Sequence, residues 1–182
     1  MMFKKIENFD LKVISFFNAH KCSPQVNRFL NFYVRLGDGY VWALIIAIVI
    51  YSHGFWNFLH VVPHILIAIL ISLLLYWAVK YSVRRKRPFD ACKEISAEVP
   101  PLDKYSFPSG HTMNNLAIAC TAFSIYPSIC WIMLLLPVTW GLLRVYFGVH
   151  YLTDIIGGIL LGILAFLISL PISTFVNILI FS

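Results

Sequence analysis

Three short clusters of residues in this chain carry side chains that could do chemistry on phosphate. The first cluster runs from Lys80 to Arg87 and includes Arg84, Arg85 and Lys86. Neighbouring cations repel one another unless an anion lies near, and planar guanidinium groups bind phosphate through two parallel hydrogen bonds. Phosphate is therefore the natural ligand of this cluster. The same residues could also form a basic patch that holds lipid head groups at a membrane surface.

The second cluster is Pro108-Ser109-Gly110-His111, a pattern that predicts the start of a helix. The first N–H groups of a helix have no partner inside it, and the helix dipole favours an anion at that end. These groups could therefore bind phosphate oxygens. On the first turn, the imidazolium of His111 could protonate a leaving oxygen. Taken alone, Pro-Ser-Gly is also a common way to begin a helix.

The third cluster contains Arg144, His150 and Asp154. If the stretch from His150 is helical, the i,i+4 spacing lets the Asp154 carboxylate reach one imidazole nitrogen and fix the tautomer of the ring. The other nitrogen is then free to act as a nucleophile. A His-Asp pair of this kind is also a common structural hydrogen bond.

Apolar stretches must position these clusters. The chain is 60% hydrophobic, with a mean hydropathy of +0.81, which excludes a water-soluble monomer. A helix needs about 20 apolar residues to cross a bilayer. The stretches without Lys, Arg, Asp or Glu are 39–79, 105–143 and 155–182. The first breaks at Ser52-His53-Gly54 and the second at Tyr126-Pro127-Ser128, so we expect an all-α polytopic membrane bundle of about five transmembrane helices.

Each two-pass stretch returns the chain to the side it left, so every charged side chain is expected at one membrane face. The three clusters would then meet there. The positive-inside bias of membrane proteins could also collect Lys and Arg on one side. The net charge of +6 fits an anionic substrate or an anionic membrane surface. Nucleic acid is not expected as a partner, because no basic helix or RNA-binding signature accompanies the charge.

The N-terminal segment, residues 1–36, is expected to be amphipathic and to lie in the membrane interface. Its apolar residues Ile6, Phe9, Val13, Phe16 and Phe17 recur at helical spacing. Ser23-Pro24 predicts the cap and first position of a second helix, through about Leu36. An ordinary helix packed on the bundle is the alternative. We expect no removable signal peptide and a single domain over residues 1–182.

In this order, the three clusters resemble the type 2 phosphatidic acid phosphatase (PAP2) family, whose pattern is K-x6-R-P, then P-S-G-H, then S-R-x5-H-x3-D. Every spacing matches, and the resemblance spans a core of roughly residues 37–160, including Leu36-Gly37-Asp38-Gly39 before the first pass. It is greatest to short bacterial undecaprenyl-diphosphatase-like members. The family serine before the arginine is Leu143 here, which removes one expected hydroxyl contact to phosphate.

The resemblance implies a mechanism. His150 would attack phosphorus, Asp154 would orient it, and His111 would protonate the leaving lipid oxygen. Water would then hydrolyse the phosphohistidine. The residues that would hold the non-bridging oxygens are Lys80, Arg87, Ser109, Gly110 and Arg144. No metal or other cofactor is implied.

The function expected is therefore that of a metal-independent lipid phosphatase. Polyprenyl diphosphate is the leading substrate, with phosphatidylglycerol phosphate, phosphatidic acid and a lipid A phosphate as the others. One alternative is a lipid phosphotransferase that uses the same site. Another is a non-enzymatic phospholipid-binding or transport protein, which needs neither His150 nor Asp154.

The expected partners are the lipid phosphate and the bilayer, and no obligate protein partner is evident from the sequence. The expected location is the cell (inner) membrane. The side on which the charged face lies stays open, because the positive-inside rule favours the cytoplasm, whereas the family resemblance favours the outer side.

Overall fold

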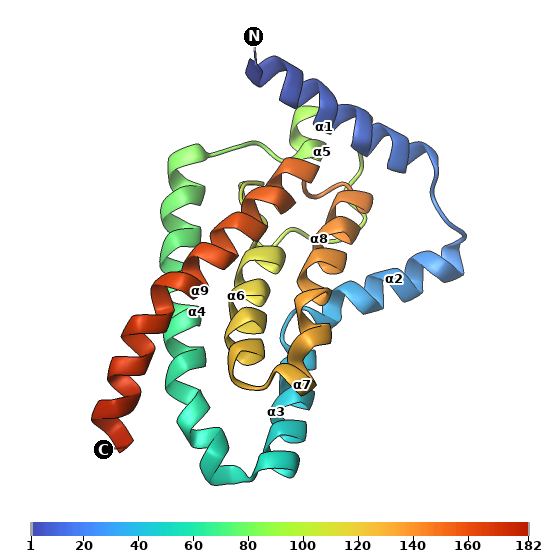
Figure 1. Cartoon of the computed structure of the whole chain (residues 1–182). Coiled ribbons are helices and arrows are strands. Elements are labelled where there is room, and N and C mark those ends of the chain that lie inside the picture. Colours follow the sequence, from blue (N-terminus) through green and yellow to red (C-terminus); the bar gives the residue numbers. More distant parts are fainter. Residues whose placement is uncertain (1, 182) are drawn as a thin grey trace.

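The computed structural model describes residues 2–181, except for the side chains of residues 2–5 and 129, and every regular element in that part of the chain is helical (Figure 1). The elements in order are α1 (Met2–Ala19), α2 (Pro24–Leu36), α3 (Tyr40–His53), α4 (Phe55–Val83), α5 (Pro88–Ala91), α6 (Gly110–Ile125), α7 (Pro127–Cys130), the 3₁₀ helix η1 (Trp131–Leu134), α8 (Leu136–Tyr146) and α9 (Leu152–Phe181).

The core of the bundle is formed by α4, α6 and α9, which pack on one another, while α3 packs against α4 and α8 against α6 (Figure 1). Small residues let α6 and α9 approach closely. A Cβ atom added to Gly162 would lie 2.7 Å from the carbonyl oxygen of Met113, and one added to Gly158 would lie 3.0 Å from that of Ser109. The second and third turns of α9 are therefore held beside the first turn of α6.

Two stretches have the length and composition of membrane spans, Phe55–Ala91 and Leu152–Phe181. The pair α2 and α3, bent by 57°, adds a third if it forms one span. The helices α3, α6 and α8 have 14, 16 and 11 residues, fewer than the roughly 20 that cross a bilayer unaided. The prediction of an all-α, multi-pass membrane bundle is confirmed, and the count of five spans stays a prediction.

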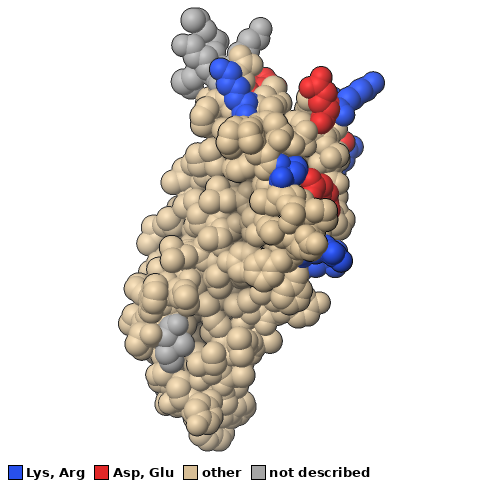
Figure 2. Space-filling model, turned by 90° about the vertical axis from the view of Figure 1, so that its right-hand side faces the viewer, with Lys and Arg blue, Asp and Glu red and all other residues tan. Residues whose placement is uncertain are grey.

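Both predicted breaks between helices lie where the sequence placed them. Gly54 separates α3 from α4 with φ 85°, and Tyr126 ends α6 before Pro127 begins α7. Leu66, Leu70 and Leu74 recur every four residues along α4 and are exposed, as expected for a lipid-facing stripe. Figure 2 shows the charged side chains of one face gathered at one end of the molecule.

The two N-terminal helices form as expected, but with differences in detail. The helix α2 begins at Pro24 after Ser23, yet within the described part of the chain the Ser23 side chain makes no cap hydrogen bond. On α1 the buried side is the one that carries Asp10 and Ile14, while Phe9 and Phe16 of the expected apolar stripe are exposed. That these two phenylalanines lie in the membrane interface stays a prediction.

Candidate active site

Lys80 and Arg87 come together on one carboxylate that the sequence did not single out. The Nζ of Lys80, in the last turns of α4, donates to Asp103 Oδ1 at 2.7 Å and to the carbonyl oxygen of Tyr105 at 3.0 Å. The Nη2 of Arg87, just before α5, donates to the same Oδ1 at 2.9 Å, and its Nη1 donates to the carbonyl of Val149 at 2.8 Å. Both cations are buried.

Asp103, in a loop, therefore pairs its single negative charge with two buried cations. Burial alone would raise the pKa of this carboxyl, but hydrogen bonds from Lys80 and Tyr76, together with the charges of Lys80 and Arg87, hold its pKa below the ordinary value. The carboxylate stays ionised, and its oxygen occupies a position in which an anion can be bound by both cations at once.

Ser109 and His111 lie at the start of α6, as predicted. Ser109 is fully buried, and its backbone N–H donates to the carbonyl of Asp154 at 3.1 Å. The Nε2 of His111 lies 2.7 Å from Asp38 Oδ1 and 2.7 Å from Arg144 Nη2. A single ring nitrogen cannot donate and accept at once, so the carboxylate matches Nε2 when it carries a proton and the guanidinium matches Nε2 when it does not. This arrangement suits a group that gives up a proton and regains it.

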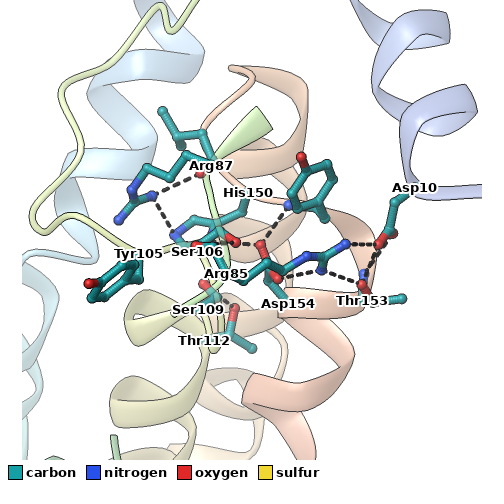
Figure 3. Close-up of polar contacts among 12 residues, drawn as sticks. Asp10, Arg85, Arg87, Tyr105, Ser106, Ser109, Thr112, His150, Thr153 and Asp154 are labelled. Atoms are coloured by element: carbon teal, nitrogen blue, oxygen red, sulfur yellow. Dashed lines mark hydrogen bonds and ion pairs between the residues drawn. The ribbon is translucent and has the colours of Figure 1, made fainter. Parts of the chain in front are cut away.

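His150 and Asp154 meet, although His150 is not helical as the spacing argument assumed (Figure 3). The helix α9 begins at Leu152, and the Asp154 side chain reaches back to accept the N–H of Tyr151 at 2.8 Å on Oδ2, as in a capping box. The same oxygen lies 3.4 Å from His150 Nδ1. A cap at the helix start thus brings the pair together, in place of the expected helical turn.

The other imidazole nitrogen of His150 faces the cations. Its Nε2 lies 3.4 Å from Arg87 Nη1 (Figure 3). Burial lowers the pKa of His150, and the charges of Arg87 and Lys80 lower it further, while Asp154 acts in the opposite direction. The imidazole is therefore neutral under ordinary conditions, and the contact with Asp154 favours the tautomer that carries its proton on Nδ1.

The three clusters surround one small cavity of about 20 Å³. Of the eight site residues predicted from the sequence, those that line it are Arg87, Gly110, His111, Arg144 and His150. Lys80 and Asp154 lie directly behind, where they contact the lining residues Tyr76 and His150, and Ser109 directly precedes the lining residue Gly110. Within the described part of the chain, the Nε of Arg144 is buried and has no hydrogen-bond partner.

Sequence reasoning missed Asp38, Tyr76 and Asp103 as neighbours of the cavity. Asp38 had a signal, because it belongs to the Leu36–Gly39 stretch shared with the resembled family, but its contact with His111 was not foreseen. Asp103 lies in an irregular loop with no periodicity to mark it. Leu143, which replaces the family serine, packs beside the apolar cluster of Val34 and Val99.

Among the residues that the structure describes, His, Cys, Asp and Glu side chains form no group of three or more that could hold a metal ion. The cations around the cavity are instead Lys and Arg side chains, which can offset the charge of a phosphoryl group themselves. That the reaction needs no metal stays a prediction.

Comparison with known proteins identifies the family of this chain. A model of the PAP2 superfamily matches residues 40–177, most of the chain. Undecaprenyl-diphosphatase of Sulfolobus acidocaldarius is 28% identical over 155 residues, which are 85% of this chain and 73% of that protein.

Two solved structures resemble the fold. A transmembrane PAP2-type phosphatidylglycerolphosphate phosphatase from Bacillus subtilis has a TM-score of 0.70 at 24% identity and covers 93% of this chain and 87% of its own. LpxE of Aquifex aeolicus has a TM-score of 0.67 at 25% identity and covers 88% of this chain and 94% of its own. With the three clusters meeting at one cavity of a multi-pass helical bundle, the chain belongs to the PAP2 superfamily and is a membrane lipid phosphatase.

Proposed function

We propose that this protein hydrolyses the phosphate or diphosphate monoester of a membrane lipid through a phosphohistidine intermediate on His150. The observation that carries the proposal is that the two ring nitrogens of His150 have different neighbours, a carboxylate and a cation. The Nδ1 of His150 lies 3.4 Å from the Asp154 carboxylate, and its Nε2 lies 3.4 Å from Nη1 of Arg87 on the cavity. The nucleophilic nitrogen thus points to the cations that would hold its target.

The proposed reaction has two balanced steps. In the first, the lone pair of His150 Nε2 forms a bond to phosphorus while the bond from phosphorus to the lipid oxygen breaks, and His111 gives its proton to that oxygen. Asp154 stabilises the positive charge that develops on the imidazole. In the second step, the oxygen of a water molecule attacks phosphorus, His111 takes the proton from this water, and the electrons of the N–P bond return to His150.

The non-bridging oxygens require donors that are in place before the reaction. We assign this task to Lys80, Arg87 and Arg144, with Ser109 and the N–H of Gly110 at the start of α6. The buried Nε of Arg144 supports the assignment, because a phosphate oxygen would supply the acceptor that this donor lacks among the described residues. An incoming phosphate competes with the Asp103 carboxylate for Lys80 and Arg87.

A route for a lipid tail supports a lipid substrate. The cavity shares Tyr76, Leu102 and His111 with a groove of about 610 Å³. This groove shares Trp42 and Ile118 with a wholly apolar cavity of about 200 Å³ between α3, α4 and α6. A head group at the charged end could therefore place the start of its chain along these helices. We propose polyprenyl diphosphate as the substrate, which agrees with the name of the Sulfolobus relative.

The test is the release of inorganic phosphate in detergent with EDTA, from polyprenyl diphosphate, phosphatidylglycerol phosphate, phosphatidic acid and a lipid A phosphate. The wild-type protein is compared with His150→Ala and with the control His20→Ala, since His20 is an exposed histidine beyond α1. We expect release by the wild type and the control alone, fastest from polyprenyl diphosphate. Equal rates in all three proteins would exclude the histidine mechanism, and phosphate found in a second lipid instead of water would indicate transfer.

A further inference from the structure

We propose that Asp10 of the N-terminal helix is a positioning residue of the active site, acting through Arg85 on Asp154. The inference rests on the proposed roles of His150 and Asp154. It assigns a task in the reaction to α1, which lies outside the part of the chain matched by the family model.

The first observation is that Asp10 is fully buried. Among the described residues, its side-chain hydrogen bonds go to Arg85 and Thr153 (Figure 3). Its Oδ2 accepts a hydrogen bond from Arg85 Nη2 at 2.6 Å, and its Oδ1 accepts the backbone N–H of Thr153 at 3.1 Å. The hydroxyl of Thr153 also donates to Oδ2. Because Thr153 directly precedes Asp154, the carboxylate of α1 is fastened to the first turn of α9.

The second observation concerns the far side of the same guanidinium. The Nη1 of Arg85 donates to Asp154 Oδ1 at 2.7 Å and to Thr153 Oγ1 at 2.7 Å (Figure 3). The guanidinium carbon lies 3.9 Å from the centre of the Tyr151 ring. A planar guanidinium with both ends engaged fixes the plane of the carboxylates it binds. Holding Oδ1 of Asp154 leaves Oδ2 directed at His150.

The third observation is the balance of charge. Two fully buried carboxylates, Asp10 and Asp154, share the single positive charge of Arg85. If Asp10 were neutral, Arg85 would pair with Asp154 alone and draw its negative charge away from His150. Asp154 would then stabilise less well the positive charge that develops on the imidazole during attack. The loss would fall on turnover and not on substrate binding, because neither Asp10 nor Arg85 lines the cavity.

Docking of α1 alone does not account for an acid at this position. A buried carboxylate is costly to desolvate, and an apolar side chain of similar size commonly serves packing as well or better. Ile14, one turn further along α1, is buried and already packs against Val145 and Ile155. The carboxylate of Asp10 therefore aligns Arg85 and Asp154, which a hydrophobic side chain at this position could not do.

The experiment compares Asp10→Asn with Glu7→Gln, a matched exchange of carboxylate for amide on an exposed position of the same helix. We expect Asp10→Asn to lower kcat between about tenfold and a hundredfold, with KM changed less than about twofold. Glu7→Gln should keep the wild-type kcat. Arg85→Lys, which keeps the charge but cannot engage two carboxylates in a planar fork, should lower kcat at unchanged KM in the same way.

Thermal melting in detergent separates alignment from folding. If the activity of Asp10→Asn or Arg85→Lys falls only in proportion to the loss of folded protein, or if both keep the wild-type kcat, the proposal is overturned. In the Arg85→Lys background, Asp10→Asn should add little, because the two residues act as one unit, and fully multiplicative effects would contradict the relay. If His150→Ala retains turnover, the proposed function itself fails, whatever Asp10→Asn does.

Discussion

Replacing Asp154 with asparagine keeps the size of a completely buried side chain and removes its charge. The carboxylate faces three donors: Arg85 Nη1 at 2.7 Å on Oδ1, and the N–H of Tyr151 at 2.8 Å and His150 Nδ1 at 3.4 Å on Oδ2. An amide has one acceptor oxygen and one NH₂ group. In either orientation its NH₂ therefore faces a buried donor.

The size of the effect follows from which donor loses its acceptor. If the NH₂ group replaces Oδ2, it favours the tautomer of His150 with the proton on Nε2, so the attacking lone pair is lost. If it replaces Oδ1, Arg85 loses a charged partner, and a neutral oxygen is left to support the imidazolium. In Ser-His-Asp hydrolases the same exchange lowers kcat about 10⁴-fold. We expect about 10³- to 10⁴-fold here, or about 4–5.5 kcal/mol of activation free energy.

The assay is phosphate release under saturating lipid substrate in detergent, with Asp90→Asn as the control, since Asp90 is an exposed acid in α5. We expect the control to keep wild-type turnover and both variants to melt cooperatively. A kcat of Asp154→Asn within tenfold of the wild type, in folded protein, would refute the reasoning that this carboxylate orients and charges the nucleophile.

The remaining predictions test the cations, the helix packing and the protonation of the nucleophile. Arg87→Lys should lower kcat/KM about a hundredfold, because an ammonium cannot replace the guanidinium contacts with both the Asp103 carboxylate and the Val149 carbonyl. Lys86→Arg, at an exposed position, is the control. An unchanged kcat/KM of Arg87→Lys would contradict this prediction. Gly162→Ala should lower the free energy of unfolding by about 1–3 kcal/mol, because its Cβ would lie 2.7 Å from the carbonyl oxygen of Met113. An unchanged melting temperature in detergent would contradict the close packing of α6 and α9. Burial holds the pKa of His150 below the ordinary 6.5, so the neutral attacking form should persist as the pH falls to 6.5 and be lost only below it. Rapid-quench rates of phosphoenzyme formation, corrected for ionisation of the substrate, check this prediction on the acid side of the pH profile, because loss of the His111 proton lowers the rate only as the pH rises. A half-maximal rate on the acid side at or above pH 6.5 would contradict it.

Much of the fold could be predicted because the bilayer core disfavours charged side chains, which leaves long uncharged runs in the sequence. A long run without charges has to be broken by polar residues, glycine or proline where the chain turns, and Gly54 and Tyr126 mark those turns. The number of spans could not be read in the same way. Short helices such as α3 and α8 reach only part of the bilayer thickness by length alone, and apolar composition does not distinguish them from full spans.

The site was predictable where its members are close in sequence or follow a shared pattern. The spacing from His150 to Asp154 indicated their contact, although the capping box at Tyr151 produces it by a different route. Asp10 and Asp103 were missed, because their partners lie far away in sequence and no local periodicity links them. A signal for Asp10 did exist, because this acid lies on the same side of α1 as the apolar Ile14. A carboxylate buried beside apolar residues needs a charged or hydrogen-bonding partner.

The central claim is that phosphorus is transferred first to His150 and only then to water. Each in-line displacement inverts the configuration at phosphorus, so two displacements restore it. The most direct measurement is the steric course of hydrolysis of a lipid phosphate made chiral with oxygen isotopes and sulfur. The account predicts net retention of configuration, and net inversion would contradict it by showing a single direct attack of water.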